Sequence, residues 1–379
     1  MGNYIKLGRI KSIAIAAALL LLLIAQTTIA KYSGGTGEPN DPYRIATAED
    51  LNDIGNHYED WWDKQFILVN DVNLAQYTGT QFKIIGPFSG VFDGNNHKVW
   101  NFTWTSTGRN GIGLFTLVGV RGQIKNLGME NINLIAANGS LVGGLVGTNR
   151  KGTITNCYSS GSISGISGVG GLVGENDAMI TECYSTVSVL GSYGVGGLVG
   201  ANGDPISGTI TNSYSTSSVV GIRDVGGLAG GNSGTITNCY STGDVSGNEY
   251  VGGLVGYNTG IVGYSRIINC YSIGVVDGNT HVGGLLGQVA REVVDSFWDI
   301  ETSGQLTSAG GIPKTTAEMK TMSMFTEAGW DFVEVWGIGE GQTYPYLRFA
   351  PAGDFNYDKM IDLFDLAILS SHWLENAGH

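Results

Sequence analysis

The sequence predicts an all-β chain folded as a parallel β-helix, or β-solenoid, with short capping helices and a small C-terminal calcium-loop and helix tail. Three observations predict this fold. A unit of about 26 residues recurs through the middle of the chain, glycine is abundant at 61 residues against 7 prolines, and 42% of residues are hydrophobic while 14% are charged. Glycine among Val, Ile, Thr, Ser and Asn is typical of short strands with tight corners. Such an apolar chain is not expected to be disordered.

The repeat consists of two strings that alternate along the chain. The first, Val-Gly-Gly-Leu-x-Gly, has its leucine at positions 145, 172, 198, 228, 254 and 285. The second, of the type TITNCYS, is centred on Cys157, Cys183, Ser213, Cys239 and Cys270. Two units are longer because of Asn202–Gly208 and Asn258–Ser265, which we expect to form loops at the edge of a coil.

The second string favours strands over helices. Cys239–Val245 alternates small or apolar residues with polar or aromatic ones, and a period of two places the two sets on opposite faces of a strand. Coils that stack at about 4.8 Å would bury their apolar faces only against their neighbours. We expect the paired glycines to provide positive φ at corners and close approach between coils.

The chain resembles the family of GLUG motif proteins, and GGLVG, GGLAG and GGLLG carry the resemblance. Segments 32–51, 84–104 and 113–128 are similar to the usual lead-in to such arrays, and 296–305, 315–332 and 344–347 to the usual exit. The resemblance implies an extracellular or cell-surface bacterial protein, sometimes adhesin-like or attached to a larger secreted enzyme. It implies no activity for the repeat itself.

The organisation along the chain follows from these patterns. Lys6, Arg9 and Lys11 precede the apolar run 13–24, and small residues end at Ala30, which predicts a cleaved signal peptide over 1–30. An uncleaved anchor is the alternative, but the run is short for a membrane span, and we expect no span in the mature chain. The further divisions are an N-terminal cap with the first coils (31–135), the GLUG solenoid (136–300), a C-terminal cap (301–350) and a dockerin-like tail (351–379).

Two short segments are expected to be capping helices that cover the open ends of the sheet. Thr47–Asp50 begins one, with Leu51 and Ile54 on a single side. Thr315 and Glu318 form a capping box that begins another, which runs through Phe325. Four tryptophans near the first coils are expected to belong to the core rather than to a sugar platform: Trp61, Trp62, Trp100 and Trp104.

The C-terminal residues have the spacing of a calcium loop. Positions 1, 3, 5, 7, 9 and 12 of an EF-hand loop supply oxygen ligands, and here they are Asp354, Asn356, Asp358, the Met360 carbonyl, Asp362 and Asp365. An amphipathic segment follows, and the whole resembles a dockerin repeat. That resemblance implies calcium and a cohesin-like partner. Lys359 departs from the usual glycine, and a dockerin usually has two repeats, so a calcium-stapled tail that only caps the chain is the alternative.

Cysteine and tyrosine occupy adjacent repeat positions and therefore opposite faces of one strand. Cys157, Cys183, Cys239 and Cys270 are expected to form an inward row of buried thiols; the alternative is two disulfides between neighbouring coils. The tyrosines would form a second row. It either stabilises the sheet by ring stacking or presents a platform for a glycan. Its members are Tyr158, Tyr184, Tyr214, Tyr240 and Tyr271.

The sequence favours a binding role over catalysis. The acids between 143 and 287 occupy different repeat positions and do not form a row, and His281 is the only histidine there. The net charge of −13 disfavours nucleic acid as a partner. We therefore expect a secreted, non-catalytic protein for adhesion or for binding a polysaccharide or cell-surface glycan. The alternatives are a β-helix polysaccharide lyase or glycoside hydrolase, or its accessory subunit, and a structural spacer.

Overall fold

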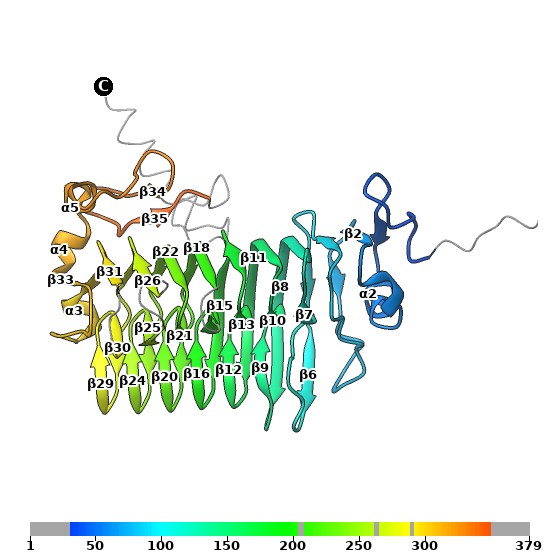
Figure 1. Ribbon diagram of the computed structural model, residues 1–379, viewed down its shortest axis with the longest axis horizontal. Helices are drawn as coiled ribbons and strands as arrows, with labels where there is room; N and C mark the ends of the chain where they lie inside the picture. Colours follow the sequence, from blue (N-terminus) through cyan, green and yellow to red (C-terminus); the bar gives the residue numbers. More distant parts are fainter. Residues whose placement is uncertain (1–30, 204–207, 261–264, 289–291, 350–379) are drawn as a thin grey trace, which may run out of the picture.

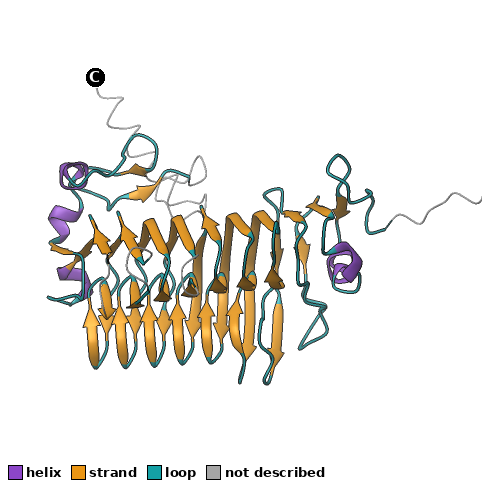
Figure 2. Cartoon of the chain, viewed as in Figure 1, coloured by secondary structure: helices purple, strands orange, loops and turns teal. Residues whose placement is uncertain are grey.

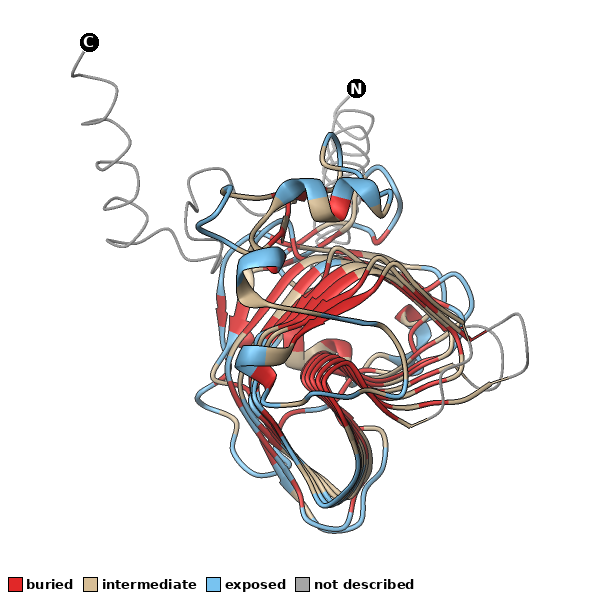
Figure 3. Cartoon of the chain, turned by 90° about the vertical axis from the view of Figure 1, so that its left-hand side faces the viewer, coloured by how far each residue is buried: buried red, intermediate tan, exposed pale blue. Residues whose placement is uncertain are grey.

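The computed structural model describes residues 31–203, 208–260, 265–288 and 292–349. They form a parallel β-solenoid of about nine turns whose coils stack along the long axis of the molecule (Figure 1). Helices lie at the two ends of the stack (Figure 2). Seen along the axis, the strands superpose and the buried residues line the inside of the coil (Figure 3). The predicted fold class is confirmed for this part of the chain.

One 26-residue coil shows the plan of the repeat. It contains β12 (Ser167–Gly170), β13 (Val173–Asn176), β14 (Met179–Thr181) and β15 (Tyr184–Leu190). Each strand pairs in parallel with the same repeat position of the next coil, as Val169 does with Val195 and Val173 with Val199. The sequence spacing therefore sets the register directly.

The strands form three parallel sheets. The six-stranded sheet adds to β12 the strands β9 (Ser140–Gly143), β16 (Tyr193–Gly196), β20 (Arg223–Gly226), β24 (Glu249–Gly252) and β29 (Thr280–Gly283). The seven-stranded sheet adds to β13 the strands β7 (Phe115–Val118), β10 (Val146–Asn149), β17 (Val199–Asn202), β21 (Ala229–Asn232), β25 (Val255–Asn258) and β30 (Leu286–Gln288).

The largest sheet contains β14 and β15 and extends to both ends of the stack. Its other strands are β1 (Tyr43–Ile45), β2 (Gln65–Leu68), β3 (Val72–Asn73), β4 (Val91–Asp93), β5 (Lys98–Trp100), β6 (Thr103–Ser106), β8 (Gln123–Ala136), β11 (Thr153–Ser164), β18 (Thr209–Ser215), β19 (Val219–Val220), β22 (Thr235–Ser241), β23 (Val245–Ser246), β26 (Arg266–Ile268), β27 (Tyr271–Ser272), β28 (Val276–Asp277), β31 (Glu292–Val294), β32 (Phe297–Asp299) and β33 (Ile312–Lys314). A separate antiparallel pair joins β34 (Trp336–Gly337) to β35 (Tyr346–Leu347).

The paired glycines serve close packing and not left-handed corners. None of the glycine pairs before the repeat leucines has a positive φ, so that part of the prediction is wrong. A Cβ at Gly197 would instead overlap the Ser215 Oγ of the same coil and the Gly227 carbonyl oxygen of the next coil. The backbone of one coil thus lies directly against the next, which only glycine permits.

A buried row of asparagines, which the sequence analysis did not single out, ties successive coils together. The side-chain amides of the first four members each donate to the amide oxygen of the next coil at 2.8 Å, starting with Asn149 to Asn176. The row satisfies polar groups that would otherwise be costly to bury. Its members lie two residues after the last glycine of each Val-Gly-Gly-Leu-x-Gly string: Asn149, Asn176, Asn202, Asn232 and Asn258.

Left-handed corners precede the cysteine position, and asparagine provides most of them. Asn156 and Asn212 have φ of 50° and 48°, whereas Glu182 holds φ 54° at the same position. Asparagine adopts this conformation at less cost than most residues, for which it costs about 1–2 kcal/mol.

We expect Glu182→Asn to raise the free energy of unfolding by about 1 kcal/mol, measured by urea denaturation. Glu182→Gln is the control, and an equal gain from it would refute this explanation.

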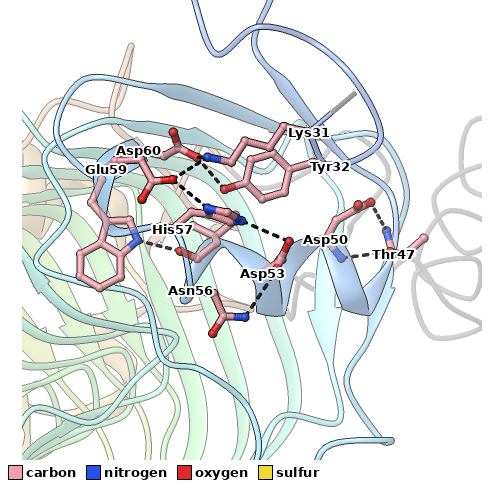
Figure 4. Close-up of polar contacts among 11 residues, drawn as sticks. Lys31, Tyr32, Thr47, Asp50, Asp53, Asn56, His57, Glu59 and Asp60 are labelled. Carbon is pink, nitrogen blue, oxygen red and sulfur yellow. Dashed lines mark hydrogen bonds and ion pairs between the residues drawn. The ribbon is translucent and has the colours of Figure 1, made fainter. Parts of the chain in front are cut away.

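The N-terminal end is closed by α2 (Ala48–Ile54), as predicted, with a capping box between Thr47 and Asp50. Next to it, the 3-10 turn η1 (Tyr58–Asp60) brings the buried Asp60 carboxylate to Lys31 Nζ at 2.6 Å and to the Tyr32 hydroxyl at 2.8 Å (Figure 4). The polar contacts in Figure 4 hold the first described residues against the cap.

The C-terminal end carries α3 (Ile300–Ser303), α4 (Thr316–Met319) and α5 (Met322–Glu327). The capping box of Thr315 and Glu318 is confirmed. The predicted single helix through Phe325 is wrong, because it breaks at Lys320 and a second helix begins after Thr321. None of the described helices is long and apolar enough to cross a membrane.

The four tryptophans near the first coils do not share one environment. Trp104 is 2% exposed and belongs to the core, as predicted, and Trp61 is partly buried. Trp62 is 59% exposed and Trp100 is 36% exposed, so the core prediction is wrong for these two.

Candidate functional site

The cysteine row is an inward row of reduced, buried thiols, as favoured from the sequence. Cys157 Sγ lies 3.2 Å from the Thr155 carbonyl oxygen, and Cys239 Sγ lies 3.1 Å from that of Thr237. Burial raises the pKa of Cys157 and of Cys239, and the neighbouring thiol of the next coil adds to the rise. Among the described residues, no group of three or more His, Cys, Asp or Glu could hold a metal ion.

The tyrosine row, named here the tyrosine stack, consists of Tyr158, Tyr184, Tyr214, Tyr240 and Tyr271. Ring centroids of successive members lie 4.9, 5.1, 4.7 and 5.0 Å apart, and the interplanar angles do not exceed 15°. The spacing follows from the in-register pairing of the strands that carry the rings. Offset stacking of this kind stabilises a sheet.

The tyrosine stack is covered by residues 330–349, named here the C-terminal cover. Trp336 lies 6.2 Å from the rings of both Tyr240 and Tyr271, and the Tyr271 hydroxyl donates to the Pro345 carbonyl oxygen. Tyr184 is 9% exposed and Tyr271 is 1% exposed. The open platform of five rings that the sequence allowed is therefore not present, and ring stacking accounts for the covered members.

The uncovered end of the stack borders a pocket, named here the stack-end pocket. Its volume is about 380 Å³, and its apolar wall is made by Tyr158, Tyr184, Leu127, Gly128 and Phe349. Gly128 is in register with Tyr158, so it stands where the next ring would be. A Cβ there would collide with the Tyr158 ring. The glycine therefore ends the stack and leaves space beside its last ring.

Polar groups on the other side of the stack-end pocket are mostly amides. Asn156 Nδ2 donates to Asn126 Oδ1 at 3.0 Å, and Asn126 Nδ2 donates to Asp93 Oδ1 at 3.0 Å. Asn96 and His97 complete the lining. Amides can donate to and accept from hydroxyl groups. An aromatic ring beside several amides can therefore hold a ring-shaped, hydroxylated ligand.

The Tyr158 hydroxyl is fixed by an ion pair just outside the stack-end pocket. It donates to Glu130 Oε1 at 2.7 Å, and Glu130 Oε2 lies 2.8 Å from Lys98 Nζ. Burial raises the pKa of Tyr158, and the bond to Glu130 raises it further. The phenol therefore stays neutral at any physiological pH, and its ring orientation is held by the carboxylate.

A second cluster brings together acids that the sequence analysis treated as scattered. Arg223 Nε lies 3.8 Å from Asp224 Oδ1 and 3.7 Å from Glu249 Oε2, and its guanidinium lies 4.8 Å from the centre of the Tyr250 ring. Burial raises the pKa of Asp224; Arg223 opposes that rise and Glu249 adds to it. The signal was present in the sequence, since Arg223 and Glu249 occupy the same position of successive coils.

The predicted calcium ligands lie outside the described residues, as do the predicted signal peptide (1–30) and the whole dockerin-like tail (351–379). The ligands concerned are Asp354, Asn356, Asp358, Met360, Asp362 and Asp365. The central residues of the two longer coil loops, 204–207 and 261–264, also lie outside them.

Comparison with known proteins finds a known motif in the repeat region. The GLUG motif matches residues 138–164, 165–190, 191–220, 222–246 and 247–277. Halomucin of Haloquadratum walsbyi is 32% identical over 154 residues, which are 38% of this chain and 2% of that protein. A protein of Evansella cellulosilytica, provisionally named a Gly-rich membrane protein, is 31% identical over 159 residues, 37% of this chain and 18% of that protein.

Among solved structures, a Bacteroides ovatus protein provisionally named an immunoglobulin A1 protease is similar in fold. The TM-score is 0.54 at 21% identity, over 84% of this chain and 96% of that one. The likeness therefore extends beyond the repeats to most of the solenoid and its ends. Residues 138–277 are five GLUG motifs, each folded as one coil of a parallel β-solenoid.

Proposed function

We propose that this chain is an extracellular or cell-surface solenoid that binds a glycan without cleaving it. The observation that carries the proposal is the stack-end pocket, where the last ring of the tyrosine stack meets three asparagine side chains. A location at the cell surface is supported by the leader-like residues 1–30 and by the similarity to the Evansella cellulosilytica protein named a Gly-rich membrane protein. Adhesion would follow if the glycan belongs to another cell.

The pocket suits a neutral sugar better than a charged or extended ligand. Its volume of about 380 Å³ is at the lower end of the range for ligand sites, which fits one or two sugar rings. The apolar face of a sugar would lie on the Tyr158 ring, and the amides of Asn126 and Asn156 would bind its hydroxyl groups. The nearby Lys98 is already paired with Glu130, and the described lining of the pocket includes no lysine or arginine that would favour an acidic sugar.

We expect Tyr158→Ala to weaken polysaccharide binding by about tenfold, which corresponds to about 1.4 kcal/mol. The reason is that the substitution removes the ring surface on which the sugar lies. Tyr158→Phe should retain most of the affinity. The measurement is the retention of the full chain on columns of immobilised mannan, xylan, β-glucan and galactan, tested separately.

Tyr193→Ala is the matched control, because Tyr193 is exposed on β16, away from the pocket. Equal weakening by Tyr158→Ala and Tyr193→Ala would contradict the pocket as the binding site. A wild-type chain that passes every column unretained would contradict glycan binding itself and would favour the structural spacer.

We also propose that the C-terminal tail binds one calcium ion and docks to a cohesin-like protein. The support is the spacing of Asp354, Asn356, Asp358, Asp362 and Asp365.

Titration calorimetry should find one calcium site per chain, and the Asp354→Ala, Asp358→Ala double variant should lose it. Asp277→Ala, which removes an exposed solenoid acid, should bind as the wild type does. Unchanged binding in the double variant would contradict the loop as the site.

Polysaccharide cleavage is the second candidate, and the cluster around Asp224 is the observation that favours it. A carboxyl whose pKa is raised, beside a second carboxylate, is a common arrangement for an acid–base pair. Arg223 pairs with both acids, however, and this favours a structural ion network. The cluster also lies outside the stack-end pocket.

A further inference from the structure

A second pocket lies near the N-terminal end of the solenoid, far in sequence from the tyrosine stack. It is named here the N-terminal pocket, and its volume is about 420 Å³. The turn after α2 contributes Gly55, the segment before β4 contributes Thr80 and Lys83, and β6 with the turn after it contributes Trp104, Ser106 and Arg109. The site is thus assembled from three separate parts of the chain.

Two polar atoms of this lining are buried without a partner. Trp104 Nε1 and Ser106 Oγ have no hydrogen-bond partner among the described residues. The Trp104 side chain is almost wholly buried, at 2% exposure. An indole N–H only donates, and leaving such a donor buried and unbonded is unfavourable. A ligand that accepts hydrogen bonds would recover that cost.

The two basic residues of the pocket are also without a counter-ion. Lys83 and Arg109 are exposed, and neither takes part in an ion pair within the described part of the chain, where Lys31, Lys64 and Lys98 each pair with a carboxylate. The Arg109 guanidinium lies 5.5 Å from the centre of the Trp104 ring. This contact holds the charge over the indole ring. The whole chain has a net charge of −13. Two unpaired cations at one pocket therefore make its local charge opposite in sign to that of the chain.

We propose that the N-terminal pocket binds an oxyanion, such as a carboxylate, sulfate or phosphate group. Trp104 Nε1 and Ser106 Oγ would donate to its oxygens, and Arg109 and Lys83 would balance its charge. Charge-assisted hydrogen bonds of this kind are the stronger ones in proteins. A planar guanidinium suits the paired oxygens of such a group. The site is independent of the stack-end pocket and of its neutral ligand.

The test follows the indole N–H signal of Trp104 by nitrogen-15 NMR in the full chain, with Trp104→Phe used to assign it. Glucuronate, sulfate and inorganic phosphate are titrated separately, with sodium chloride at matched ionic strength as the reference. We expect a saturable shift of the Trp104 signal with at least one of the three oxyanions, and the three arms distinguish carboxylate from sulfate and phosphate.

Variants connect the shift to the two cations. Arg109→Gln and Lys83→Gln should each weaken the response about tenfold or more, and Arg109→Lys should retain part of it. Lys151→Gln removes an exposed charge outside the pocket and should leave the response unchanged. The proposal is overturned if none of the oxyanions shifts the Trp104 signal more than chloride does. It is also overturned if the Arg109→Gln variant responds as fully as the wild type and the Lys151→Gln control do. Neither result would affect the glycan assay on Tyr158.

Discussion

Replacing Gly197 by alanine is expected to lower the free energy of unfolding by about 3 kcal/mol. A Cβ at this position would overlap the Gly227 carbonyl oxygen of the next coil and the Ser215 Oγ of its own coil. Gly227 lies between β20 and β21, and both strands are held by parallel pairing. Its carbonyl oxygen therefore cannot move aside without separating two coils. Urea denaturation followed by circular dichroism measures the change.

Gly231→Ala is the matched control for this prediction. Gly231 lies on β21, and the nearest atom to a Cβ there is the Tyr257 carbonyl oxygen at 4.0 Å. Alanine should be neutral or stabilise the fold by about 0.4–1 kcal/mol through the unfolded chain. If the two substitutions had the same effect, close approach of coils would not be the reason for the glycine pair.

The second large effect is a loss of stability at alkaline pH. The pKa of Cys157 and of Cys239 is raised by burial. In the unfolded chain these thiols ionise near pH 8.5. Above that pH the folded state holds protons that the unfolded state has lost, so stability falls as pH rises. The fall is about 1.4 kcal/mol per pH unit for each thiol and continues until the pH reaches the folded pKa.

Tyrosines extend this loss to higher pH. Burial raises the pKa of Tyr271, and burial with a bond to Asp299 raises the pKa of Tyr344 to about 12. Their unfolded pKa is near 10, so each begins to lower stability there, and the contribution of Tyr344 ends near pH 12. Below pH 8 all four groups are protonated in both states and have no effect.

Urea midpoints measured from pH 7 to pH 11 test the alkaline loss. The double variant Cys157→Ser, Cys239→Ser is the control, because Ser213 already occupies the same repeat position and donates to the Thr211 carbonyl oxygen at 2.8 Å. In this variant the stability should no longer fall between pH 8.5 and pH 10, but it should still fall above pH 10, where the tyrosines ionise. A variant with the full wild-type slope in that first interval would show that the buried thiols are not its cause.

Much of the fold could be predicted from the sequence because residues at one repeat position contact each other. The periodic leucines and valines specify the register directly, so Val195 pairs with Val225 even though extra residues separate the coils. The capping boxes at Thr47 and Thr315 are local signals and could also be read. The asparagine at 176 and its equivalents were equally visible as a repeated letter, but their role depends on burial.

The candidate site could not be predicted because it depends on contacts outside the repeat. Tyr271 and Pro345 are 74 residues apart, and nothing in a periodic pattern indicates that the C-terminal cover lies on the tyrosine stack. The Tyr158 end of the tyrosine stack can, by contrast, be recognised in the sequence. IKNLG at 124–128 aligns with ITNCY at 154–158, which places Gly128 where a tyrosine would continue the row. The N-terminal pocket left no such signal, since its residues come from three unrelated segments.

The most direct test of binding without cleavage is the chain length of a polysaccharide that the protein retains. The retained polymer is incubated with the full chain, with and without calcium, and its molar mass is followed by size-exclusion chromatography with light scattering. We predict retention with no change in molar mass and no new reducing ends. Shortening of the polymer by the wild type, abolished in the Asp224→Asn variant, would contradict a binding role and would identify the Asp224 cluster as an active site.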